Sequence, residues 1–177
     1  TIEAYAEESV QENLVENLPQ GSSISSKNHI KDIDTYRIVL SNGIQVYYKQ
    51  TDFQNDNVLV SAYSPGGTSM YSLDSLLASE LATPYLGQAG YGGLSVSDME
   101  KFMSGKTASF QSSVNTYQEG GSGNATNKDL ETLFELIYVN FTSLNKNEAV
   151  FNALLNNLKA YYPSLLSNPQ TFFQVAI

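Results

Sequence analysis

The dipeptide Asn42-Gly43 constrains the fold of this 177-residue chain more than any other local feature. It separates two short runs of β-branched and aromatic residues, at residues 36–40 and 44–48. Asn and Gly both tolerate the positive φ angles of a tight hairpin turn, so the two runs are predicted to pair as antiparallel strands. A third strand is predicted over residues 58–63, closed by the turn sequence Pro65-Gly66-Gly67.

Two helices are predicted after these strands. Residues 72–87 have a helical pattern, although Pro84 lacks an amide hydrogen and is expected to kink or shorten the helix. Ser97 and Glu100 have the spacing of a capping box, in which each side chain satisfies a backbone N–H at the start of a helix. We therefore expect a short second helix to begin there.

A second hairpin and a second helix pair complete the predicted order. Residues 107–115 alternate like a strand, and the glycine-rich residues 118–126 are predicted to pair with them. Asn127 is predicted to cap one helix, and Asn145 with Glu148 to open another, which Pro163 and then Asn168-Pro169 break or end. The order predicts an α+β fold, with helices packed on one face of a largely antiparallel sheet.

The amino-terminal region predicts a boundary. Apolar residues recur at helical spacing over residues 2–18, and the serine- and glycine-rich residues 20–27 have the composition of a flexible linker. We therefore expect a helix in residues 1–19, a linker in residues 20–35 and a domain in residues 36–177. The first residue is not Met and the last residues are apolar, so we expect a fragment of a longer polypeptide, with this domain truncated at its C-terminal end.

Charge and residue counts exclude several functions. The net charge of −9 and the pI near 4.4 argue against nucleic-acid partners, since phosphates would be repelled. No apolar run reaches the roughly 18 residues of a membrane span. The chain has no cysteine and one histidine, His29, which we expect to be a solvated linker residue. It therefore lacks the ligands for a typical zinc site and the groups for several nucleophilic triads.

Two stretches carry a resemblance to a known family. They are LSNGIQVYYKQTDFQNDNVLVSAYSPGGTSMYSLD, residues 40–74, and LSVSDMEKFMSGKTASFQSSVNTYQEGGSGNATNKDLETLFELIYVNF, residues 94–141. In order, they contain an Asn-Gly hairpin, a strand ending in small residues, and a D-L-E-x-L-F-x-L-I-Y sequence that opens a helix after a second hairpin. This order resembles the pitrilysin/insulinase-like zinc metallopeptidases, and the resemblance implies a pitrilysin-like half-domain.

The resemblance also implies that this half is noncatalytic. The active half of such peptidases has an H-x-x-E-H helix, in which two histidines bind zinc and the glutamate activates water. Aligned on residues 72–87, the histidine positions hold Ser79 and Thr83, and the glutamate position holds Ala82. The further ligand falls near Lys159. We therefore predict no catalytic residue and no metal in this segment, and zinc in the active half of a parent metalloendopeptidase.

Peptide binding is the remaining candidate activity. A sheet edge can pair with an extended peptide by strand addition, and we select residues 107–115 for this role, naming Phe110, Ser112 and Val114. Gly87, Gly90, Gly92 and Gly93 do not have the spacing of a phosphate-binding loop. These glycines predict a mobile or tightly bent turn with a structural role. The alternative is a loop that contacts peptide.

Two roles stay open at this point. The chain is either a noncatalytic domain that helps an active half enclose unfolded peptide substrates, or a stand-alone scaffold that pairs with a separate active peptidase chain. An H-x-x-E-H motif upstream in the same reading frame would favour the first role, and a nearby start codon the second. The compartment is undetermined, the bacterial periplasm or cell envelope being one option.

Overall fold

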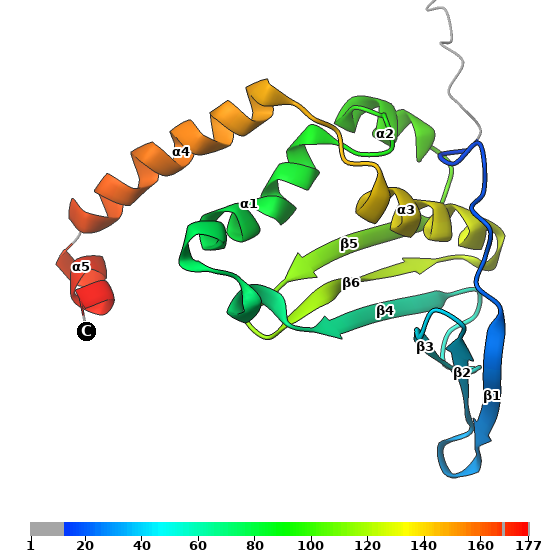
Figure 1. Cartoon of the computed structure of the whole chain (residues 1–177). Helices are drawn as coiled ribbons and strands as arrows, with labels where there is room; N and C mark the ends of the chain where they lie inside the picture. The colour runs from blue at the N-terminus through cyan, green and yellow to red at the C-terminus, as the bar shows by residue number, and fades with distance from the viewer. Residues whose placement is uncertain (1–12, 168, 177) are drawn as a thin grey trace, which may run out of the picture. The chain divides into compact units, whose positions relative to one another are not determined.

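The computed structural model describes residues 13–167 and 169–176 (Figure 1). The chain forms two compact units. The smaller unit is Val15–Asn57, and the larger contains Val58–Ile177 together with the amino-terminal Thr1–Leu14.

The smaller unit is an antiparallel three-stranded sheet in the order β1-β2-β3. Its strands are β1 (Ile24–Ile30), β2 (Thr35–Leu40) and β3 (Gln45–Tyr48), with a 3-10 turn at Lys31–Ile33. The hairpin predicted at Asn42-Gly43 is confirmed. Gly43 has φ 89°, and the Asn42 Oδ1 atom accepts a hydrogen bond from the Ile44 N–H at 3.1 Å.

The prediction of a flexible linker or loop over residues 20–27 is wrong from Ile24 onward, where β1 begins, whereas residues 20–23 have no regular secondary structure. The side chains of β1 are mostly exposed and polar, so its sequence does not alternate between apolar and polar residues. It is a strand because it pairs with β2. His29 is exposed, as expected, and it also has two neighbours. Its Nε2 atom lies 2.7 Å from Asp34 Oδ1, and its ring stacks on that of Tyr36 with centroids 4.6 Å apart.

The helix expected over residues 2–18 falls mostly on residues 1–12, outside the described residues. Residues 13–18 lie within the described part and are not helical, which corrects that end of the prediction. Leu14 is buried there.

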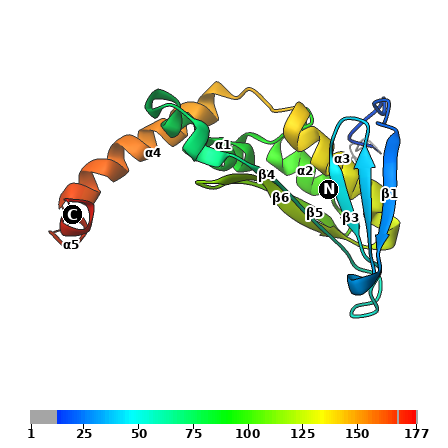
Figure 2. The same cartoon turned by 60° about the horizontal axis from the view of Figure 1, so that its bottom comes forward.

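The larger unit contains a three-stranded antiparallel sheet in the order β4-β6-β5 (Figures 1 and 2). The strands are β4 (Val58–Pro65), β5 (Ala108–Val114) and β6 (Gln118–Ala125). The helices are α1 (Leu73–Ala89), α2 (Val96–Phe102), α3 (Leu130–Thr142), α4 (Glu148–Ser167) and α5 (Pro169–Ala176), with 3-10 turns at Gly67–Met70 and Asn127–Asp129. The predicted α+β class is confirmed, with the strands divided between two sheets.

The glycines of β6 make room for large side chains on the face that α3 covers. A Cβ atom at Gly121 would collide with the Phe110 ring, and one at Gly123 would lie 3.0 Å from Leu133 Cδ1. Leu133 is fully buried, and the Phe110 ring meets that of Phe141 edge-on with centroids 5.9 Å apart. The weak strand signal of β6 therefore reflects a packing requirement.

Two expected helix breaks are wrong and one is confirmed. Pro84 and Pro163 lie inside α1 and α4, so Pro84 does not shorten α1 and Pro163 does not end α4. Helix α4 does end at Ser167, and Pro169 is the first residue of α5, where its missing N–H costs nothing. The capping box of α2 uses Ser95 and Asp98 in place of Ser97 and Glu100. Both pairs have the same spacing, so the spacing alone does not distinguish them.

Candidate functional site

Helix α1 carries Ser79, Ala82 and Thr83, the residues that the resemblance aligns with the peptidase motif. Ser79 and Thr83 are one turn apart on the same side of the helix, and both are half-buried. The Ser79 Oγ atom donates a hydrogen bond to the Leu76 carbonyl of its own helix at 2.7 Å. Ala82 is exposed and offers no proton acceptor. The hydroxyl of Ser79 is therefore used locally.

These residues do not fit a zinc ion. Imidazole, thiolate and carboxylate are its usual ligands. Among the described residues, no group of three or more His, Cys, Asp or Glu side chains comes together. Lys159, at the expected position of the further ligand, is exposed on α4. We derive no metal chemistry for this part of the chain.

Strand β5 presents an unpaired edge in the described part of the chain, where it pairs with β6 alone. The Asn115 N–H donates to the Gln118 carbonyl at 2.8 Å, and the Thr107 carbonyl accepts from the Thr126 N–H at 3.0 Å. Because main-chain groups alternate in direction along an antiparallel strand, odd-numbered residues of β5 face β6 and even-numbered residues face outward. The predicted residues Phe110, Ser112 and Val114 thus have outward-facing main-chain donors and acceptors.

The side chains of these three residues point elsewhere. They lie on the face that packs against the helices, and Phe110 is buried there. What β5 can offer a peptide at these positions is therefore its main chain. Helix α1 contacts β5, the strand with the open edge.

Asn145 fixes the glycine-rich loop between α1 and α2. Its Nδ2 atom donates to the Ala89 carbonyl at 3.1 Å and to the Leu94 carbonyl at 2.6 Å, and its Oδ1 atom accepts from the Gly93 N–H at 3.1 Å. Gly90 and Gly93 have φ angles of 74° and 77°, in the region that favours glycine. The loop is tightly bent, as one of the two predicted structures has it, but Gly87, also expected in this turn, lies inside α1.

The sequence prediction gave Asn145 a different role, as the residue that opens α4. The Oδ1 atom of Asn147 accepts from the Val150 N–H at 3.1 Å and makes that cap instead. Tyr85 adds a second link, donating to the Asn145 carbonyl at 2.9 Å and accepting from the Asn147 N–H at 2.6 Å. These bonds tie the part of α1 that follows Pro84 to the residues just before α4. No local sequence signal marks such a long-range contact.

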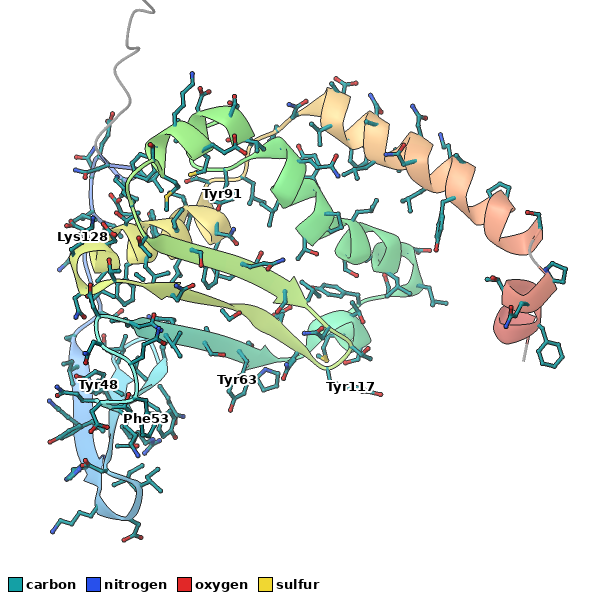
Figure 3. All side chains as sticks on the ribbon, turned by 180° about the vertical axis from the view of Figure 1, so that it is seen from behind. Tyr48, Phe53, Tyr63, Tyr91, Tyr117 and Lys128 are labelled. Atoms are coloured by element: carbon teal, nitrogen blue, oxygen red, sulfur yellow. The ribbon has the colours of Figure 1, made fainter. Side chains whose placement is uncertain are left out.

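The pKa shifts in this unit follow from structural contacts. The pKa values of Asp98 and Asp129 are lowered, chiefly by hydrogen bonds from the Ser95 side chain and from the Thr107 N–H respectively. A general acid at neutral pH needs a raised carboxyl pKa, which is the opposite direction. Burial raises the pKa of Tyr91, and a hydrogen bond with Asn140 partly opposes this shift. Tyr91 lies among the helices of this unit (Figure 3).

Comparisons with known proteins show which proteins this chain resembles. No family model matches the chain. A zinc protease PQQL-like protein of Arabidopsis thaliana is 26% identical over 142 residues, which cover 80% of this chain and 12% of that protein. The periplasmic protease PqqL from Escherichia coli has a similar solved structure, with a TM-score of 0.83, 23% identity, and coverage of 98% of this chain and 19% of PqqL.

A second solved structure extends the comparison. A mutant of the ferredoxin protease FusC, solved in complex with Arabidopsis ferredoxin, has a TM-score of 0.68 and 19% identity and covers 81% of this chain and 16% of FusC. The chain thus spans a small part of each relative's length. The predicted resemblance to pitrilysin-like zinc proteases and the predicted fold are confirmed. No helix among the described residues is both long and apolar enough to cross a bilayer.

Proposed function

We propose that this chain, a relative of the pitrilysin-like zinc proteases, is a noncatalytic domain that helps to enclose and bind unfolded peptide while an active half elsewhere holds the zinc. The observation that carries the proposal is the composition of α1. Its motif positions hold Ser79, Ala82 and Thr83, yet the helix still contacts the open-edged strand β5. A domain that has lost the metal ligands and kept the strand edge retains a means of holding a peptide.

Strand addition at β5 is the proposed mode of binding. The outward main-chain groups of Phe110, Ser112 and Val114 could pair with an extended peptide in the manner of a further strand. Main-chain pairing makes few demands on side chains, so it suits a domain that meets many sequences. The packed ring of Phe110 keeps the strand rigid, which lowers the entropy lost on binding.

The parent arrangement is part of the same proposal. Residues 1–19 would end the preceding half, residues 20–35 would connect the halves and include β1, and residues 36–177 would form the noncatalytic domain. PqqL is described as periplasmic, and we propose the same compartment for this chain.

The test measures zinc content and peptide handling together. The purified 177-residue chain is dialysed against zinc, analysed by elemental mass spectrometry, and mixed with a labelled unstructured peptide. We expect peptide binding without cleavage, and zinc far below one equivalent. Stoichiometric zinc, or cleavage that a chelator abolishes, would overturn the noncatalytic assignment.

A further inference from the structure

The β4-β6-β5 sheet has a second face, opposite the side chains that pack against the helices. This face carries residues 59, 61 and 63 of β4, which lie across from residues 124, 122 and 120 of β6 and residues 109, 111 and 113 of β5. We call it the open face. Figure 3 shows Tyr63 on the side of β4 away from the helices.

The open face carries no charged residue, although the chain has a net charge of −9. Solvated protein surfaces ordinarily mix charges of both signs. A face without them neither attracts nor repels a partner according to its charge. Its chemistry must come from neutral hydrogen-bonding groups and apolar contact.

Hydroxyl and amide groups supply the hydrogen-bonding capacity. Ser61, Ser122 and Gln111 form the middle row across the three strands. Their side chains make no hydrogen bond within the described part of the chain, whereas the Ser109 hydroxyl donates to Asn124 Oδ1 at 2.7 Å. Hydroxyls and carboxamides both donate and accept, as the main chain of a polypeptide does at almost every residue.

Apolar side chains border the polar row. A shallow, open groove of about 770 Å³ is lined by residues of all three strands, among them Leu59, Ser109 and Gln111. Leu59 and Tyr63 flank the row on β4 and are 76% and 77% exposed. Tyrosine binds varied side chains with little loss of conformational entropy. The groove thus combines neutral polar contacts with an apolar border.

We infer that the open face is a charge-indifferent binding surface for an extended segment of unfolded polypeptide, whose main-chain amides hydrogen-bond to the row of Ser61, Ser122 and Gln111. The inference rests on the proposed function and adds a second contact to it, separate from the edge of β5. It also names the substrate class as neutral, cationic and anionic segments alike. The absence of charge on both the face and the peptide main chain supports this occupant.

The test uses three fluorescent synthetic peptides of equal length, identical except that one is neutral, one carries lysines and one carries glutamates. Binding to the full chain is followed by fluorescence anisotropy at low and at physiological salt. At physiological salt, where charges elsewhere on the chain are largely screened, we expect dissociation constants within about threefold of one another because the contacts carry no charge. A strong preference for the lysine peptide, as the net charge alone would produce, would overturn the inference.

Two matched variants locate the surface. Gln111→Arg with Ser122→Arg places two cations on exposed positions of the open face, whereas Asn152→Arg with Asn156→Arg makes the same charge change on exposed positions of α4. We expect the first variant to bind the glutamate peptide at least about tenfold more tightly than the lysine peptide, since charge then enters the contact. The second variant should keep nearly equal affinities, and circular dichroism checks that both fold.

The outcomes separate the two proposals. If all peptides bind and both double variants behave alike, the open face is not the contact and the inference fails, while the proposed function stands. If no peptide binds the wild-type chain, the inference and the binding part of the proposed function fail together. If a soluble oligosaccharide binds the groove and the peptides do not, the occupant is wrong.

Discussion

The carboxylate of Asp129 accepts a hydrogen bond from the Thr107 N–H at 2.7 Å, joining the residue before α3 to the residue before β5. The same oxygen accepts from the Thr126 hydroxyl at 2.9 Å, and the side chain is buried. One carboxylate therefore ties together the β5-β6 hairpin and the helix that covers it. It belongs to the scaffold of the sheet.

Protonation of Asp129 should destabilise the larger unit. Its folded pKa is lowered, first by the Thr107 N–H bond, with help from Thr126 and nearby lysines. A lowered pKa means that the stabilisation is fully present above the unfolded value near 3.9 and is lost as the pH falls through the folded value. Urea midpoints measured from neutral to acidic pH should therefore fall at the acid end, and less steeply in Asp129→Asn.

The Asp129→Asn variant should also be less stable than the wild-type chain at neutral pH, because an amide oxygen is a weaker hydrogen-bond acceptor than a carboxylate. Asp129→Ala should be less stable still, since it leaves the Thr107 N–H without its partner. Equal stability of all three proteins at pH 7 would contradict this account.

Replacing glycine by alanine should lower the free energy of unfolding at one position, Gly123, and raise it at another, Gly87. Gly123→Ala places a methyl group against Ser109 and Leu133, and should cost about 1–3 kcal/mol of unfolding free energy through overpacking. Gly87 lies in α1 with open space around it, so Gly87→Ala should stabilise by about 0.5–1 kcal/mol. Denaturant titration measures both, and a destabilising Gly87→Ala would show that α1 is packed differently.

Removal of the Asn145 clamp should loosen the loop between α1 and α2. Asn145→Ala leaves the Ala89 and Leu94 carbonyls and the Gly93 N–H without this partner, a loss of about 1–3 kcal/mol. Amide hydrogen exchange should rise in residues 89–94. The neighbouring Lys146 is exposed, and Lys146→Ala serves as the control, with an effect within about 0.5 kcal/mol.

Proline at adjacent positions of β5 should separate binding from folding. The Ser112 N–H faces outward, so Ser112→Pro should keep the fold, as edge strands tolerate proline on the solvent side, and should weaken peptide binding by about fivefold or more. The Ser113 N–H faces β6, so Ser113→Pro should lower the melting temperature instead. Unchanged peptide affinity in a folded Ser112→Pro variant would rule out strand addition at this edge.

The sequence predicted those elements whose backbone hydrogen bonds and side-chain contacts are made between residues close together in the chain. The Asn42-Gly43 turn, the strands around it and the amphipathic α3 each depend on neighbours in the chain, so propensity and spacing predict them. Whether Phe110, Ser112 and Val114 meet a peptide is a matter that local pattern does not decide.

The sequence by itself determined the α+β class, the first hairpin, and the chemistry missing from Ser79, Ala82 and Thr83, because these follow from residue identity and short-range spacing. Only the tertiary structure decided that Ile24–Ile30 is a strand, that helix α1 continues through Pro84, and that Asn145 clamps a loop more than fifty residues earlier. Those features depend on hydrogen-bonding partners that come close only after the chain has folded.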